Sequence, residues 1–174
     1  GYNTRRDGSG ENYSVNDMIL KLTAEDNATI ILYAQWDLLS NYAEVSFDTQ
    51  GGNTIDSKVL KKGSKLGTLP ESTKKNYTFI NWRKDSLTGS VVNSNTIIDA
   101  DTTLYAEWKK NPIVSFYSGI SSFPEQRQVA YGKPIGTLPV FAPGLYMYKT
   151  FVGWFTSMTG GTQITARTTV TEDV

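Results

Sequence analysis

Short stretches in which hydrophobic and polar residues alternate recur along the chain. In residues 30–36 every second side chain is apolar, and the same division returns in residues 102–108. A period of two residues is typical of a strand that buries one face. We therefore predict half-buried strands in both segments, with apolar faces formed by Ile30, Leu32, Ala34 and Trp36 in the first and by Leu104, Ala106 and Trp108 in the second.

The stretch before the glycine pair at 51–52 is also predicted to be a strand. Val45 and Phe47 share one face of it, and it ends where a turn requires the positive φ that glycine adopts readily. Residues 58–63 are predicted to form a short outgoing strand. Together with the alternation around residue 82, this pattern predicts a core that contains Phe47, Phe79 or Ile80, Trp82, Leu104 and Trp108.

Helical periodicity is weak throughout the chain. Residues 16–22 come closest to a period of 3.6 residues, and an Asn or Asp cap there would allow about two helical turns. One further short helical turn is expected near residues 66–76. The fold class predicted from these signals is mostly β, with the small helical share of an α+β module.

The hydrophobic blocks return in the same order, which indicates an internal repeat. Residues 29–36 recur at 102–108 and residues 79–82 at 151–154, both shifted by 72, whereas the blocks at 44–47 and 66–70 recur shifted by 69. The extra residues fall in a loop, where insertions are tolerated. The predicted domains are the C-terminal part of a first repeat (1–36), a complete second repeat (44–108) and a third repeat that lacks its last strand (113–174).

The repeated blocks resemble a known family. The sequence Val-Ser-Phe-Asp-Thr-Gln-Gly-Gly-Asn at 45–53, with Leu-Gly-Thr-Leu-Pro at 66–70, Tyr-x-Phe-x-x-Trp at 77–82 and Thr-Leu-Tyr-Ala-Glu-Trp at 103–108, is similar to the Listeria–Bacteroides repeat, also known from the internalin B-repeat. Residues 1–10 resemble another segment of the same family. The resemblance implies β-grasp-like modules of about 70 residues in tandem in bacterial surface proteins.

Composition narrows the chemistry that the chain can perform. Its 174 residues include 17 Lys and Arg against 17 Asp and Glu, so no net charge favours nucleic acid or an anionic membrane. With no His and no Cys, Ser-His-Asp and Cys-His catalysis, disulfides and the usual zinc sites are impossible. Residues 30–34 are the longest apolar run, far short of the about 20 that membrane insertion requires.

The aromatic residues fall into two groups. The four tryptophans, Trp36, Trp82, Trp108 and Trp154, recur at matching repeat positions and are expected to pack in the cores of their own repeats. Several aromatic residues of the third repeat lie outside the repeat pattern, and tyrosine is enriched in interfaces. The candidates for contact with a ligand or partner are Tyr117, Tyr131, Tyr146 and Tyr148.

Two classes of function fit these features. The first is a non-catalytic stalk and adhesive repeat, an adhesin region whose weak contacts with host protein, glycan or neighbouring repeats are multiplied by tandem copies. The second is a dedicated carbohydrate- or host-protein-binding module that uses the third-repeat tyrosines. A hydrolase would need two carboxylates across a cleft, and the sequence places neither Asp99/Asp101 nor Glu25/Asp26 in that way. We therefore expect no enzyme, cofactor or metal.

The resemblance also gives the expected location and one expected association. It implies a secreted protein at the bacterial cell surface or cell wall, although residues 1–6 do not resemble a signal peptide and residues 69–73 do not match a sortase signal. A third repeat without its last strand leaves an open sheet edge, which predicts strand exchange between chains or a mobile C-terminal third. Stalks crosslinked by Lys–Asn amide bonds are an open alternative.

Overall fold

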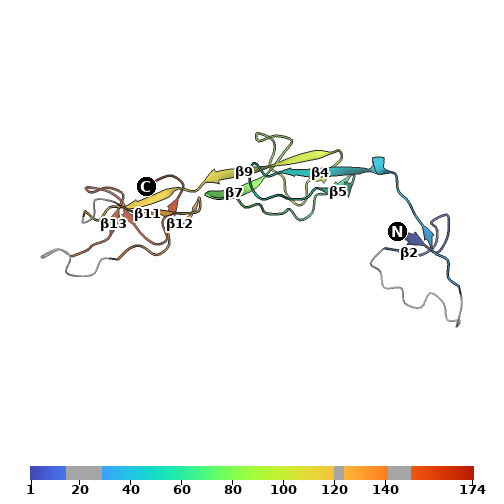
Figure 1. Ribbon diagram of the computed structural model, residues 1–174, viewed down its shortest axis with the longest axis horizontal. Helices are drawn as coiled ribbons and strands as arrows, with labels where there is room; N and C mark the ends of the chain where they lie inside the picture. The colour runs from blue at the N-terminus through green and yellow to red at the C-terminus, as the bar shows by residue number, and fades with distance from the viewer. Residues whose placement is uncertain (15–28, 120–123, 141–149) are drawn as a thin grey trace. The chain divides into compact units, whose positions relative to one another are not determined.

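The structure is a computed structural model that describes residues 1–14, 29–119, 124–140 and 150–174 (Figure 1). The described residues are mostly β, and their one helical element is the 3-10 turn η1 (Leu39–Asn41). The chain divides into two units, Gly1–Tyr42 and Ala43–Val174, which are described separately below. The helix expected at residues 16–22 lies outside the described residues.

The first unit contains a small antiparallel sheet. Its strands β1 (Tyr2–Asn3), β2 (Asn12–Tyr13) and β3 (Tyr33–Ala34) lie in the order β2-β1-β3. The amide of Asn3 is fully buried and organises the turn between β1 and β2, because its Nδ2 donates to the backbone carbonyls of Gly8 and Gly10 and to Asn12 Oδ1. The residues between β1 and β2 therefore form a turn held by one side chain.

Trp36 does not pack in a core, so that part of the core prediction is wrong. Its side chain is 92% exposed, whereas Leu32, Tyr33 and Gln35 are half-buried, so this segment does not bury the single face that was predicted. The reason is that β3 is only two residues long and pairs with β1 alone. The sheet therefore ends before it reaches Trp36.

A four-stranded sheet forms the second repeat. Its strands are β4 (Tyr42–Asp48), β5 (Lys58–Lys61), β7 (Tyr77–Lys84) and β9 (Thr102–Lys110), in the order β5-β4-β9-β7. β9 lies parallel to β4 and antiparallel to β7, and the short strands β6 (Ser64–Lys65) and β8 (Ile97–Ile98) form a separate antiparallel pair. The first and last strands of the repeat are thus neighbours at the centre of its sheet.

The core of the second repeat matches most of the residues expected for it. Trp82 and Leu104 are almost fully buried, and Phe47, Phe79 and Trp108 pack against them while keeping part of their surface exposed. The choice between Phe79 and Ile80 is settled for Phe79, because Ile80 is 40% exposed. A shift of register between Phe79 and Asn81 breaks the alternation there and brings Phe79 onto the face of Trp82.

No helix forms in residues 66–76, so the helical turn expected there is wrong. Side chains from elsewhere bind this backbone in place of helical hydrogen bonds. Asn53 Oδ1 accepts hydrogen bonds from Ser72 Oγ at 2.9 Å and from the backbone N of Thr73 at 2.6 Å. Leu69 precedes a proline, which further disfavours helical backbone.

The Leu-Gly-Thr-Leu-Pro motif, which reads Ile-Gly-Thr-Leu-Pro at 135–139, holds one tryptophan in the second repeat and one in the third. The indole Nε1 of Trp82 donates to the carbonyl oxygen of Pro70 over 2.7 Å, and that of Trp154 donates to Pro139 over 2.9 Å. The glycine of the motif has a φ of 70° in the second repeat and 81° in the third, a conformation that glycine adopts without strain. In both repeats the motif therefore holds an indole against the apolar cluster, where Trp82 is buried and Trp154 half-buried.

The third repeat reproduces the second with shorter strands. Its hydrogen-bonded pairs are β10–β11, β12–β15 and β13–β14. The strands are β10 (Ile113–Phe116), β11 (Glu125–Gln128), β12 (Lys133–Pro134), β13 (Trp154–Phe155), β14 (Gln163–Ile164) and β15 (Thr169–Val170). They enclose a second apolar cluster, whose buried members are Val114, Phe116, Val129, Ile135 and Val170.

Val174 occupies the place in the third repeat that Thr102 occupies in the second. Its backbone N donates to Ile113 O at 3.0 Å, and its carbonyl oxygen accepts from Ser115 N at 2.6 Å. Asp173 Oδ1 accepts from the backbone N of Ile113 just as Asp101 accepts from Glu44. Val174 thus begins the pairing beside β10 that β9 makes beside β4.

Candidate functional site

The four candidate tyrosines are not brought together within the described residues. Tyr117 is 71% exposed just after β10, whereas Tyr131 is half-buried between β11 and β12. Tyr146 and Tyr148 lie outside the described residues. A contact surface shared by these tyrosines stays a prediction, and of the two described candidates Tyr117 is the more exposed.

Tyr131 instead takes part, through its backbone, in a hydrogen-bonded joint between the second and third repeats. Thr78 Oγ1, on β7, donates to Asn111 Oδ1 over 2.6 Å. The backbone N of Tyr131 donates to the same two oxygens, at 3.0 Å to Thr78 and 3.3 Å to Asn111. The side chain of Thr78 in the second repeat, the backbone N of Tyr131 in the third and the side chain of Asn111 between them therefore share a single network, which we call the Asn111 joint.

The covalent link through this joint is short. Only Asn111 and Pro112 separate β9 from β10. The backbone N of Asn111 donates to Asn76 O at 2.9 Å on the side of the second repeat, and Val129 N donates to Pro112 O at 3.0 Å on the side of the third. Proline fixes its own φ and Pro112 is buried, so the link has few freely rotating bonds.

Aromatic side chains also gather in a shallow depression of the first unit, a feature that sequence reasoning missed. The depression has a volume of about 460 Å³ and is lined by Gly1, Tyr2, Asn12, Tyr13, Ser14, Gln35, Trp36 and Asp37. In the second repeat the tryptophan equivalent to Trp36 is Trp108, which packs edge-on against Phe79 and donates its Nε1 to Thr49 O at 2.9 Å. In the second repeat, where a first strand and turn accompany it, this repeat position therefore serves packing.

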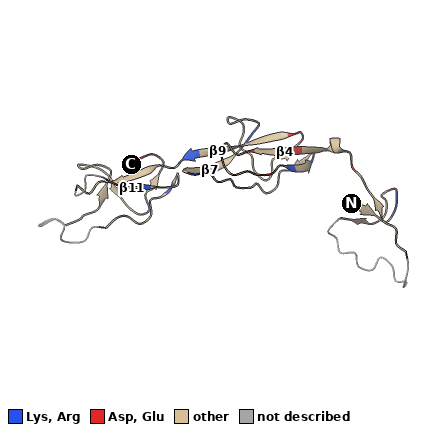
Figure 2. Ribbon diagram, viewed as in Figure 1, with Lys and Arg blue, Asp and Glu red and all other residues tan. Residues whose placement is uncertain are grey.

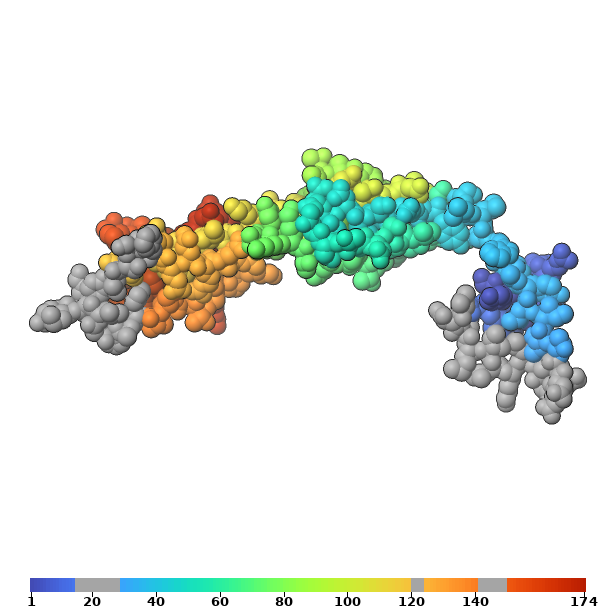
Figure 3. Space-filling view, viewed as in Figure 1, coloured from blue at the N-terminus to red at the C-terminus, as the bar shows by residue number. Residues whose placement is uncertain are grey.

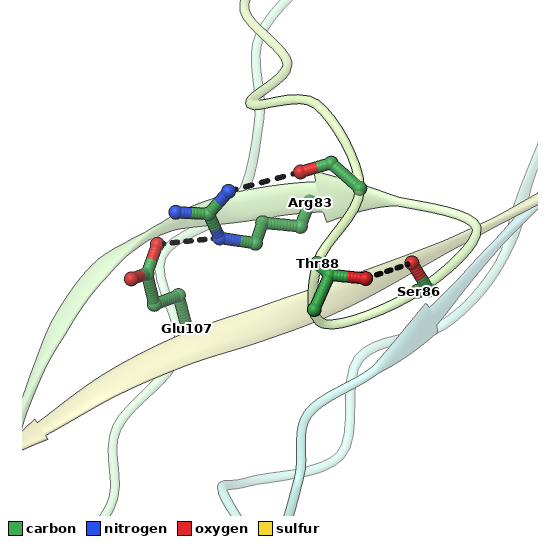
Figure 4. Close-up of polar contacts among 5 residues, drawn as sticks. Arg83, Ser86, Thr88 and Glu107 are labelled. Atoms are coloured by element: carbon green, nitrogen blue, oxygen red, sulfur yellow. Dashed lines mark hydrogen bonds and ion pairs between the residues drawn. The ribbon is translucent and has the colours of Figure 1, made fainter.

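An ion pair crosses from β7 to β9 on the second repeat (Figure 4). Arg83 Nε lies 2.8 Å from Glu107 Oε2, and Arg83 Nη1 donates to the carbonyl oxygen of Gly89 at 2.9 Å. The same view shows the hydrogen bond between the Ser86 and Thr88 hydroxyls, which closes the turn after β7. The hydrogen bond from Arg83 holds the pKa of the Glu107 carboxyl below its ordinary value.

The substitution Glu107→Gln is expected to reduce stability by about 0.5 kcal/mol at pH 7, because the pair is partly exposed and screened by solvent. Since the folded pKa of Glu107 is lowered, its contribution is complete above the ordinary value of 4.5 and is lost as the pH falls through the folded pKa. Urea unfolding of both proteins at several pH values measures this difference. A difference that grew below pH 4.5 would contradict the assignment.

The described residues show neither a metal cluster nor a helix suited to a membrane. Among them, no three His, Cys, Asp or Glu side chains gather closely enough to hold an ion. Within the same ranges, no helix is both long and apolar enough to cross a bilayer.

On the face that Figure 3 shows, the second repeat (cyan to yellow) is a filled body without a deep hollow. Figure 2 shows basic residues at the end of β9, where Lys109 and Lys110 lie, and acidic residues at other positions.

The alternative of Lys–Asn amide crosslinks can be compared with one contact between these residue types, that of Lys65 Nζ with Asn95 Oδ1. The two atoms lie 3.1 Å apart, and both side chains are exposed. This geometry is that of an ordinary surface hydrogen bond.

Comparison with known proteins decides the family. Residues 44–107 and 114–174, more than half of the chain, each match the Listeria-Bacteroides repeat domain. The chain belongs to the Listeria–Bacteroides repeat family. Each of the two matched repeats contains a tryptophan whose Nε1 donates to the proline carbonyl of the Leu-Pro pair, Trp82 in one and Trp154 in the other.

Two relatives of this Listeria–Bacteroides repeat protein come from Evansella cellulosilytica. One, named "Putative Gly-rich membrane protein", is 31% identical over 157 residues, which are 89% of this chain and 17% of the relative. The other, named "Putative membrane protein", is 30% identical over 128 residues, which are 72% of this chain and 18% of the relative. The chain thus spans less than a fifth of either relative. No solved structure matches it significantly.

Proposed function

We propose that this chain is part of the repeat region of a bacterial cell-surface protein, where it acts as a non-catalytic stalk with adhesive contacts made by its tandem, β-grasp-like modules. The observation that carries the proposal is the Asn111 joint. A chain that only tethered two domains would need no hydrogen bonds between them, whereas a spacer that holds its outer end away from the cell needs joints that resist bending. The joint provides such resistance.

The argument for a stiff joint rests on how its bonds are distributed. Asn111 is bound on both sides at once, by its backbone to Asn76 of the second repeat and by its side chain to Thr78 and Tyr131. Rotation about the link would break several of these bonds together, and each is worth about 0.5–1.5 kcal/mol. Two modules joined in this way keep one preferred orientation.

The relatives support a location in the cell envelope, since both carry names that describe membrane proteins. We infer that the repeats lie on the extracellular side and that their partners are a host protein, a glycan or neighbouring repeats. The balance of 17 basic and 17 acidic residues supports a surface without a strong preference for polyanions. The absence of His and Cys supports a non-catalytic role.

The substitution Asn111→Ala is expected to widen the distribution of distances between the second and third repeats. The chain contains no Cys, so single cysteines introduced as Asp56→Cys and Arg167→Cys, both at exposed positions, can carry spin labels without interference. Pulsed electron spin resonance then measures the distance distribution. We expect a narrow distribution in the parent chain and a broader one after Asn111→Ala, because the bonds to Thr78 and Tyr131 are lost.

Two controls make this experiment decisive. Lys110→Ala changes an exposed neighbour of the joint and should leave the distribution narrow. Replacing Asn111 and Pro112 together by glycine gives the distribution of a flexible linker. A parent chain as broad as this glycine control would overturn the stalk proposal. Strong binding to one glycan that is lost in Tyr117→Ala would favour the dedicated binding module instead.

A further inference from the structure

The first and last strands of the second repeat run side by side in the same direction. β4 pairs with β9 in parallel register, from Val45 opposite Thr102 to Asp48 opposite Tyr105. The chain enters the repeat at the start of β4 and leaves it at the end of β9 (Figure 1). Tension on the chain therefore acts on two strands that are direct hydrogen-bonded neighbours.

The direction of that tension decides how the sheet resists it. A pull on the preceding chain draws β4 back toward its start, and a pull on the following chain draws β9 forward toward its end. Because the strands are parallel, the two forces are opposed along the strand axes. The hydrogen bonds between the strands are then sheared together, whereas a pull on adjacent ends would open them one after another.

Several contacts add to the resistance of this strand pair. β9 is a central strand, so sliding it also breaks its long antiparallel ladder with β7. Val45 on β4 and Leu104 on β9 are fully buried, and a slip of register would expose both. Trp108 Nε1, near the end of β9, is bound to Thr49 O just after β4, so this bond crosses the same interface.

The link to the third repeat continues the same path. β9 leads through Asn111 and Pro112 into β10. The hydrogen bonds between β10 and Val174 are those of a parallel pairing like that of β4 with β9. We propose that the second repeat is a force-bearing module, in which β4 and β9 form a shear clamp against tension along the chain. This property goes beyond the stalk role and does not depend on the stiffness of the Asn111 joint.

The test compares two pulling directions in the otherwise unchanged full chain. Glu44→Cys with Lys110→Cys provides handles at the start of β4 and near the end of β9, which load the clamp in shear. Glu44→Cys with Ala100→Cys provides handles at neighbouring ends of the two strands, which peel them apart. All three positions are exposed, and the chain has no other Cys. Single-molecule force spectroscopy measures the unfolding force of each pair at one loading rate.

We expect the shear pair to unfold at a force about twofold higher or more than the peeling pair, although both proteins have the same stability in urea, because forced unfolding follows the barrier along the pulling direction. Trp108→Phe should lower the shear force and leave the peeling force unchanged, since the bond to Thr49 O is lost. Equal forces in the two directions would overturn the clamp. That result would leave the stalk proposal standing, because the label distances test the stalk separately.

Discussion

Replacing Trp82 by alanine is expected to reduce the free energy of unfolding of the second repeat by about 3–5 kcal/mol. Only 1% of Trp82 is exposed, and its ring packs edge-on against Phe47 with the two centroids 5.0 Å apart. Its Nε1 also holds Pro70 O, so the substitution leaves both a cavity and an unpaired carbonyl. This loss is comparable with the whole stability of a small domain.

Urea unfolding, monitored through amide hydrogen exchange in the second repeat, measures this loss of unfolding free energy. Ile80→Ala is the matched control, because Ile80 lies on the same strand with 40% of its surface exposed and should cost less than about 1 kcal/mol. Trp108→Ala should fall between the two, since Trp108 is only partly buried. Equal losses for Trp82→Ala and Ile80→Ala would contradict the packing described above.

Appending the sequence of residues 103–110 directly after Val174 is expected to stabilise the third repeat by about 3 kcal/mol or more. Val174 has the place of Thr102, so the appended residues would form the counterpart of β9 beside β10. They would bring a leucine and a tryptophan over the apolar cluster of the third repeat, and burying each is worth about 1.5–3 kcal/mol.

Amide exchange at Trp154 and Phe155 reports this change, because β13 has the place of β7 next to the added strand. The control is an extension in which the leucine and the tryptophan are replaced by serine, which keeps the backbone and removes the apolar contacts. Exchange rates that are equal in the two extended chains would contradict the expectation. If the parent chain fills this place by strand exchange, sedimentation should show dimers of the parent chain and monomers of the extended one.

Periodicity of two residues was enough to predict the strands and most of the core of the second repeat. Leu104 and Ala106 are buried as expected, because β9 is regular and both of its neighbours pair with it. Ile80 and Trp36 were predicted less well for different reasons. A local shift of register turns Ile80 outward, and the first unit's sheet stops short of Trp36. Neither break leaves a mark in the hydrophobic pattern.

The remaining differences come from side chains that act over long distances in sequence. The carboxamide of Asn53 binds the backbone of Thr73, twenty residues further along the chain, and keeps that segment from becoming helical. The Asn111 joint links Thr78, Asn111 and Tyr131, which no local motif connects. Pro112 by itself indicates a stiff link, but no sequence pattern predicts the threonine and asparagine side chains that bind across it.

The pairing of the first strand with the last also determines when a repeat can fold. Val45 meets Thr102 only after almost the whole repeat is present, so a nascent or exported chain cannot close its central sheet until β9 has emerged. Contacts between residues so distant in sequence make folding slow compared with that of helical domains. Under the proposed cell-surface location, the second repeat should therefore stay unfolded during export and close in a single step once β9 is outside, and this closure would hinder backward sliding through the export channel.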